Sequence, residues 1–153
     1  MPMPLEYQHT TEDFERFLAD ARETSGLTTR NQVYTLVQAV LLTFRRRLSL
    51  TDAIRFAGVL PPVLRAIFVV DWDPDAPIAP FGDRAAWTRE AQSLRRHHNF
   101  APQTCIADMA RALRLHVDEA AFDAVLDRLP AGARDFWSVD QAGGSLASSS
   151  GSA

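Results

Sequence analysis

The chain has 153 residues, of which 46% are hydrophobic and 23% are charged, and its formal net charge at pH 7 is -3. This composition is typical of a soluble globular protein that is long enough to bury roughly 70% of its unfolded surface in one domain. The slight negative charge argues against nucleic acid as a partner. The apolar runs are far shorter than a membrane span and the N-terminus lacks the features of a signal peptide, so we expect a cytoplasmic protein without membrane contact.

Helical caps and apolar periodicity mark two helices at the start of the chain. Thr10 is in position to cap a helix over residues 11–24, because carboxylates follow it in the first turn and apolar residues then recur at helical spacing. Thr29 and Gln32 form the pattern of a capping box at the start of a second helix. The apolar stripe after this box continues to Leu48, which makes the second helix the longest that the sequence predicts.

Two shorter helices and a loop follow. Ser49 and Asp52 predict the cap of a third helix, and Pro61 marks the start of a fourth, since proline is well tolerated in the first helical turn. The fourth helix is expected to continue to about residue 70. Residues 72–82 contain three prolines and no helical period, so we expect a loop that joins two halves of the chain.

The second half repeats this pattern of four helices. Asp83 predicts the cap of a fifth helix, and Asn99 predicts the cap of a sixth with Pro102 in its first turn. Asp118 predicts the cap of a seventh helix, and Pro130 opens an eighth. No segment combines strict apolar and polar alternation with β-branched residues, so we expect no strands.

Two segments of the chain read alike. Residues 60–68 and 129–137 each contain a Leu-Pro step, an Arg five residues after the Leu and an aromatic residue three after the Arg. Such self-similarity is typical of one helical unit used twice, although two amphipathic patterns also align by chance. We predict an all-α fold, an orthogonal eight-helix bundle built from two related four-helix halves. The predicted boundaries are 1–137 for a single helical domain, 11–72 and 83–137 for its internal repeat, and 138–153 for a disordered tail rich in Gly and Ser.

An ordered series of short motifs resembles a known family. The motifs are Val-Leu-Leu at 40–42, Arg-Leu-Ser-Leu-Thr-Asp-Ala at 47–53, Leu-Pro-Pro-Val-Leu-Arg at 60–65 and Trp-Asp-Pro at 72–74. Over these and the flanking segments the chain resembles the bacterial domain-of-unknown-function family 2267. The resemblance implies a helical protein with two related halves, and it transfers no activity and no catalytic residue. The chain departs from the family pattern at Asp71, where Gly is usual, and in its shorter second half.

Seven arginines are the candidate binding residues. Two clusters end predicted helices, where the helix dipole favours cations, and they would bind a phosphate or an acidic partner if the halves place them side by side. A solvated charged surface is the simpler interpretation. Two single arginines occupy matching places in the repeat and are expected to bond carbonyl or carboxylate oxygens at a helix junction, with a ligand-binding pair as the alternative. The seven are Arg45, Arg46 and Arg47 in one cluster, Arg95 and Arg96 in the other, and Arg65 and Arg134.

The acidic residues of the predicted loop do not complete a metal site. Asp71, Asp73 and Asp75 alternate like the first ligands of a calcium loop, but Ala76 stands where the sharp turn needs Gly. We expect a solvated loop and no metal.

The remaining reactive side chains are sparse. His97 and His98 are adjacent and would point about 100° apart on a helix, so they cannot share one metal by themselves. Cys105 falls in an apolar helical pattern and is expected to be a buried thiol. The sequence contains none of the common nucleophile, phosphate-loop or zinc motifs, so we expect no cofactor.

Apolar and aromatic residues gather at the ends of the predicted fourth and eighth helices. They either seal the two halves together, which is the simpler interpretation, or form an exposed patch. We predict a non-enzymatic protein-binding or self-assembly module whose partner is another protein or a second copy. The alternatives are an anion or nucleic-acid binder that uses the arginine clusters and a metal-dependent enzyme. The apolar residues in question are Phe68, Val69, Val70, Trp72, Phe136 and Trp137.

Overall fold

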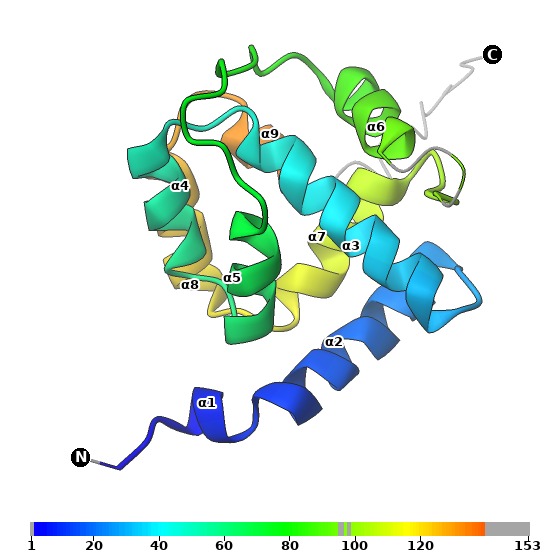
Figure 1. Ribbon diagram of the computed structural model, residues 1–153, viewed down its shortest axis with the longest axis vertical. Helices are drawn as coiled ribbons and strands as arrows, with labels where there is room; N and C mark the ends of the chain where they lie inside the picture. Colours follow the sequence, from blue (N-terminus) through cyan, green and yellow to red (C-terminus); the bar gives the residue numbers. More distant parts are fainter. Residues whose placement is uncertain (1, 95–96, 98, 140–153) are drawn as a thin grey trace, which may run out of the picture.

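The computed structural model describes residues 2–94, 97 and 99–139. Within these residues every regular element is a helix, and nine helices are present (Figure 1). The all-α fold class is therefore confirmed. None of these helices is both long enough and apolar enough to cross a membrane.

All eight predicted helices are present, and one further helix precedes them. The elements are α1 (Leu5–Gln8), α2 (Thr10–Ser25), α3 (Arg30–Arg45), α4 (Leu50–Ala57), α5 (Pro62–Val69), α6 (Arg84–Ser93), α7 (Cys105–Arg114), α8 (Glu119–Arg128) and α9 (Ala133–Phe136). The expected count of eight was wrong because α1 is a single turn that buries no residue. A turn of this kind has no apolar period for the sequence to reveal.

Four of the predicted helix caps are confirmed. In each case the side-chain oxygen accepts a hydrogen bond from a backbone N–H in the first helical turn, which satisfies a donor that the helix leaves unpaired. The cap of α3 is a complete capping box, with bonds in both directions. The four capping residues are Thr29, Ser49, Asp83 and Asp118.

Two cap predictions are wrong. Thr10 is the first residue of α2, and His9, which precedes it, makes no side-chain cap. Only His9 separates α1 from α2, so the backbone enters α2 almost directly from the preceding helix.

Asn99 ends one helix instead of starting the next. Its side-chain amide donates to the carbonyl oxygens of Ala91 and Leu94, both at 2.6 Å, which closes the end of α6. The next helix begins only at Cys105, after a turn that contains Pro102. Loop residues such as Asn satisfy whichever helix end lies nearest in space, and the sequence does not show which end that is.

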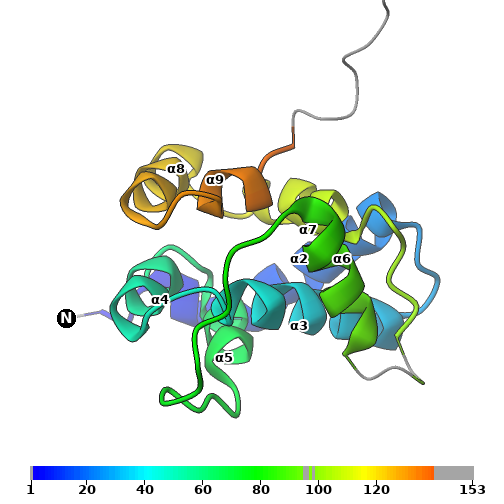
Figure 2. The ribbon, with the colours of Figure 1, turned by 90° about the horizontal axis from the view of Figure 1, so that it is seen from above.

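The middle of the fold is occupied by α3, which packs against α2, α5, α6 and α7. Figure 2 shows α8 and α9 on one side of the molecule and α4 and α5 on the other. Helices α4 and α8 contact each other where the two sides meet. The segment between Val69 and Arg84 contains no helix, as the sequence predicted.

Aromatic side chains from both sides meet in the core. Phe56 of α4 lies 5.8 Å from Phe122 of α8, measured between ring centroids, and Phe44 of α3 lies 4.8 Å from Phe136 of α9. Trp137 contacts all four of these rings, with centroid separations of 5.1–5.9 Å. Aromatic pairs at such distances stabilise a core beyond their buried area.

The apolar residues at the ends of the predicted fourth and eighth helices differ in how far they are buried. Phe68, Phe136 and Trp137 are completely buried and therefore belong to the core. Val69 is 44% exposed and therefore does not belong to the core.

Candidate binding surface

Arg45 is buried and holds the end of α5. Its Nη1 donates to the carbonyl oxygens of Phe68 at 2.9 Å and Val70 at 2.8 Å, and its guanidinium lies over the ring of Trp72 at 5.5 Å. Burial lowers the pKa of Arg45 below the ordinary value of an arginine. These contacts give Arg45 a structural role at the junction of α3 and α5.

Arg46 and Arg47 both pair with Glu90 of α6. Arg47 is buried, and it also donates to the carbonyl oxygens of Phe81 at 2.8 Å and Thr43 at 2.7 Å. Arg46 keeps more than half of its side chain exposed. The cluster therefore connects α3 with α6 and with the loop before it, and Arg46 is its one member with an exposed side chain.

The second predicted cluster cannot be compared with the first. Arg95 and Arg96 lie outside the described residues, as does His98. The proximity of the two clusters stays a prediction.

Arg65 and Arg134 each bond at a helix junction. Arg65 donates through Nε to the carbonyl of Ala57 at 3.1 Å and through Nη2 to that of Leu60 at 2.9 Å, so it closes the turn between α4 and α5. Arg134 forms a two-pronged ion pair with Asp127, which connects α9 to α8 on the surface. This hydrogen-bonded pair lowers the pKa of Asp127.

The residues considered for metal binding and nucleophilic chemistry are either buried or bonded to near neighbours in the chain. Cys105 is completely buried, and burial raises its pKa to about 11. Asp73 accepts a hydrogen bond from the backbone N–H of Asp75 at 3.0 Å. Within the described ranges no group of three or more His, Cys, Asp or Glu is arranged to hold a metal ion.

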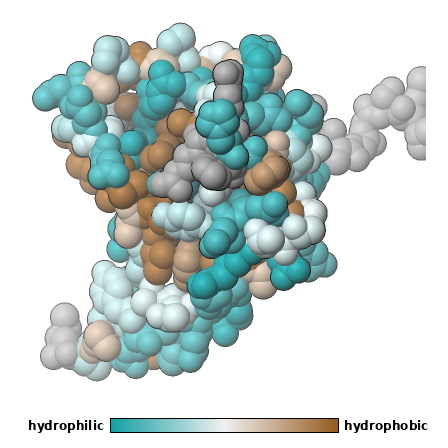
Figure 3. All heavy atoms as spheres, turned by 45° about the vertical axis from the view of Figure 1, so that its right-hand side comes forward, coloured by the Kyte–Doolittle hydropathy of each residue, from teal (hydrophilic) through white to brown (hydrophobic). Residues whose placement is uncertain are grey.

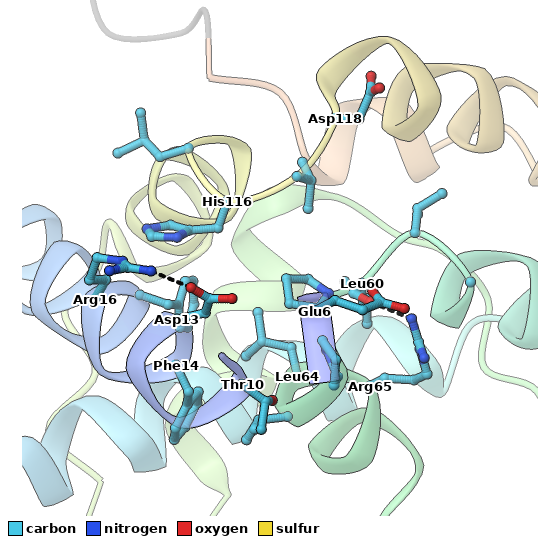
Figure 4. Close-up of a pocket in the computed structure, with 18 of the residues that line it drawn as sticks. Glu6, Thr10, Asp13, Phe14, Arg16, Leu60, Leu64, Arg65, His116 and Asp118 are labelled. Carbon is cyan, nitrogen blue, oxygen red and sulfur yellow. Dashed lines mark hydrogen bonds and ion pairs between the residues drawn. The ribbon is translucent and has the colours of Figure 1, made fainter. Parts of the chain in front are cut away.

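The sequence did not indicate the cavities beside α1. The first, which we call cavity A, has a volume of about 710 Å³ and lies between α1 and α2 on one side and the turns α4–α5 and α7–α8 on the other (Figure 4). Phe14, Leu60 and Val63 are among its apolar lining residues. Its lining also includes the hydroxyl-bearing Thr10, whose buried Oγ1 has no hydrogen-bond partner.

Two of the charged or titratable groups that line cavity A, His116 and Arg16, have acidic partners within the chain. His116 Nε2 lies 2.6 Å from Oδ2 of Asp20, which connects the end of α7 with α2. The ring of His116 stands edge-on to Phe17, with 5.5 Å between centroids. Arg16 pairs with Asp13 at the same cavity. The paired charges leave the apolar lining as the part of cavity A suited to a partner's side chain.

A second cavity, cavity B, lies on the other side of α1. It has a volume of about 580 Å³ and is lined by Tyr7, Ile54, Val69 and Trp72, among others. Cavities A and B share lining residues from α1, from the α4–α5 turn and from α5, so they adjoin each other. The shared residues are Glu6, Gly58 and Arg65.

Exposed apolar side chains surround cavity B. We call Tyr7, Leu50, Ile54 and Val69 the α4–α5 face; Ile54 is 63% exposed and Val69 is 44% exposed. Met3, Leu5, Ile78, Phe100 and Leu115 are further exposed apolar residues in the described part of the chain. Figure 3 shows hydrophobic residues that reach the surface in a hollowed band among hydrophilic ones.

The protein is therefore all-helical in its described part, and cavities A and B and the α4–α5 face lie around the short helix α1. The chain belongs to the family described as Uncharacterized conserved protein (DUF2267), whose model matches residues 14–136. The match begins in α2 and ends with α9, and it confirms the resemblance found in the sequence. No curated protein matches the chain.

Proposed function

We propose that this protein is a non-enzymatic protein-binding module and that its partner binds the α4–α5 face. The observation that carries the proposal is the exposure of Ile54 and Val69 beside cavity B. Single exposed apolar residues are ordinary, but a cluster around a groove is typical of an interaction site.

The energetics favour this use of the face. Burial of one large aliphatic side chain stabilises a complex by about 1.5–3 kcal/mol. Ile54 and Val69 project side by side, so a partner that covers both gains a contribution from each, and Tyr7 adds an aromatic ring with a hydroxyl at the edge. Asp52 and Arg55 of α4 pair with each other, and Arg65 donates to two carbonyl oxygens of its own chain, so these charges do not oppose an apolar contact.

The test replaces the two central residues with carboxylates. The full chain carrying Ile54→Glu and Val69→Glu is compared with the wild type and with Phe100→Glu, a control at a residue that is 61% exposed on a different segment. Proteins retained from source cells are identified, purified and titrated against the three chains. We expect at least a tenfold loss of affinity for the double variant and none for the control, because a buried unpaired carboxylate is costly.

Equal affinities for all three chains would remove the α4–α5 face from consideration. Circular dichroism of the double variant shows whether the helices are intact, and exposed positions of this kind tolerate charge. The anion-binding alternative has less support, since Arg45 and Arg47 are bonded to carbonyl oxygens within the chain.

We also propose that the protein consists of two related halves, residues 11–72 and 83–137. Support comes from a contact that occurs twice: Arg45 donates to the carbonyl of Phe68 and Arg114 donates to that of Trp137, both at 2.9 Å, with donors and acceptors each 69 residues apart. The helix packing also supports two halves, in which α2 and α3 correspond to α6 and α7. Helix α2 contacts α7 and helix α3 contacts α6, so the same kind of contact is made in both directions between the halves. Arg65 and Arg134 have the same spacing but make different contacts.

A further inference from the structure

We infer that cavity A binds a non-helical peptide segment of a partner protein, which inserts an aromatic side chain. This inference rests on the proposed pair of halves and adds a second site to the proposed α4–α5 face. Its basis is the second half of the molecule, in which the chain's own residues 79–82 fill the place that corresponds to cavity A.

Each wall of cavity A has a counterpart in the second half. Cavity A lies between the start of α2, the α4–α5 turn and the α7–α8 turn (Figure 4). A shift of 73 residues carries the start of α2 onto the start of α6. A shift of 69 residues, the spacing of the repeated arginine contact, carries the two turns onto the α8–α9 turn and the α3–α4 turn. The corresponding residues are Phe14 and Trp87, Val63 and Gly132, and His116 and Arg47.

Phe81 occupies the space between these three counterpart walls. Its ring lies 6.2 Å from the ring of Trp87 and 6.2 Å from that of Phe44, measured between centroids. It also lies so close to Gly132 that a Cβ at that residue would clash with it. The second half therefore encloses one aromatic side chain at the position where the first half has cavity A.

The backbone of the same segment is bonded to the walls. The N–H of Ala79 donates to the carbonyl oxygen of Arg46 at 2.9 Å. Arg47 donates through Nε to the carbonyl oxygen of Phe81 at 2.8 Å, and the indole N–H of Trp87 donates to the same oxygen. Residues 79–82 have no regular secondary structure, so their backbone groups are free to form these bonds.

The first half lacks this filling segment. Residues 6–9 correspond to 79–82, but they form most of α1 and the residue after it. Gln8 stands where the second half has Phe81; it is exposed, and its amide donates to the carbonyl oxygen of Met3 at 2.6 Å. The space between the walls stays open as cavity A, whose volume of about 710 Å³ accommodates an aromatic side chain and the backbone beside it. Because the chain's own counterpart is folded into α1, the occupant comes from a partner.

Two differences between the halves define how the occupant is held. Val63 replaces Gly132, so an inserted ring contacts an aliphatic side chain and lies further from the backbone. His116 replaces Arg47, but its Nε2 is bound to Asp20. The hydroxyl of Thr10 also lines the cavity, and its buried Oγ1 has no hydrogen-bond partner among the described residues. It is therefore the group that bonds the backbone of the occupant, because buried polar groups are normally paired.

The experiment uses the filling segment itself as the probe. A synthetic peptide of residues 76–83 is added to the ¹⁵N-labelled full chain, and chemical shifts of assigned amide and indole groups locate where it binds. Peptide concentrations reach about 2 mM, which detects a dissociation constant of about 1 mM. The same peptide with Phe81→Ala is the control for the aromatic side chain.

Three protein variants test the site. Val63→Trp and Ala121→Trp fill cavity A from two different walls, and Ile54→Trp is the matched control because Ile54 lines only cavity B. Circular dichroism shows whether each variant is folded. The shift map and the pair of peptides need no variant, so they test the inference even if a substitution prevents folding.

We expect the peptide to shift the amides of Val63, Val117 and Ala121, which line cavity A. The Phe81→Ala peptide should bind at least tenfold more weakly, since the aromatic side chain supplies most of the contact. Both filling variants should lose at least tenfold in affinity, while Ile54→Trp keeps it. An absence of shifts, equal binding of the two peptides, or shifts confined to the α4–α5 face would each overturn the inference. Shifts confined to Gly132 and the indole of Trp87 would also overturn it, because the peptide would then have displaced its own segment.

The two proposed sites can fail separately. Ile54→Glu with Val69→Glu alters the α4–α5 face and leaves every lining residue of cavity A unchanged, so this double variant should bind the peptide like the wild type. A peptide that does not bind cavity A removes the present inference and leaves the α4–α5 face to its own test.

Discussion

Three consecutive arginines show how strongly the surroundings decide what a side chain does. Arg45 and Arg47 are buried and bond backbone carbonyls, whereas Arg46 between them is mainly exposed. A guanidinium has five donors in a rigid plane, so it can satisfy several carbonyl oxygens at a helix end. The helix dipole accounts for cations at this position but does not distinguish these roles.

The first prediction separates the buried arginine from its exposed neighbour. Arg45→Ala should lower the free energy of unfolding by about 2–4 kcal/mol, because the carbonyls of Phe68 and Val70 lose a charged donor in a buried place. Arg46→Ala should cost less than about 1 kcal/mol, since its ion pair is exposed. Urea unfolding of both variants measures the difference, and equal losses would show that the Arg45 contacts contribute little.

The second prediction concerns the thiol of Cys105. Burial raises its pKa to about 11 from the ordinary 9.0, so the folded thiol stays protonated where the unfolded thiol has begun to ionise. This group therefore stabilises the fold fully below pH 9, and its contribution falls as the pH rises from 9 toward 11. At pH 9.5 a thiol reagent should label the native protein at least a hundredfold more slowly than the urea-unfolded chain.

The Phe100→Cys variant supplies the control for that measurement. Its added cysteine is on an exposed residue and should react at once in the native protein, while Cys105 of the same chain does not. Rapid labelling of both thiols would mean that α7 opens readily.

At the scale of elements, the turns decide how the helices approach each other. Gly132 begins α9 with a φ of 105°, which side chains other than hydrogen rarely allow. A Cβ placed there would lie 2.8 Å from the ring of Phe81. The glycine therefore lets the loop before α6 pack closely against the α8–α9 turn.

The third prediction follows from this close approach. Gly132→Ala should destabilise the protein by about 2–4 kcal/mol, from the backbone conformation together with the clash against Phe81. Gly26→Ala is the matched control, since Gly26 also has a positive φ of 71° but no atom within 4 Å of the added Cβ. That control should lose only about 1–2 kcal/mol. Thermal unfolding compares the two, and a Gly132→Ala variant as stable as the control would contradict the proposed packing.

At the scale of the whole molecule, the aromatic core connects the two proposed halves. The contact between Phe56 and Phe122 and that between Phe44 and Phe136 each join a helix of the first half to a helix of the second. Neither half keeps its large side chains buried without the other. These contacts support the proposal that residues 1–137 form one domain with the two halves as its internal repeat.

The fourth prediction is that the halves unfold together. In urea, tryptophan fluorescence, which reports on the buried Trp87 and Trp137, and far-UV circular dichroism should give a single coincident transition. Both signals are recorded at one protein concentration, because any association would make the midpoint depend on concentration. Two separated transitions would show that the halves are independent domains.

Much of the architecture was predictable because it depends on neighbours in the chain. Caps such as Ser49 and Asp118 bond backbone groups three residues away, and apolar periodicity marks the buried side of each helix regardless of what covers it. The helical class, the loop before α6, the buried Cys105 and the family were all accessible in this way. The single turn α1 was not, since nothing apolar on it is buried.

The binding surface was decided by contacts between residues far apart in the chain. His116 and Asp20 meet across 96 positions, and Glu90 finds Arg46 and Arg47 from another helix. A sequence pattern records which residue types recur, but it does not record which helix lies opposite them. For this protein the sequence by itself determined eight of the helices, four of their caps and their buried sides, because those depend on local spacing. Only the tertiary structure decided which arginines are bound within the chain and where the apolar face and its cavities lie, because those depend on how the helices pack.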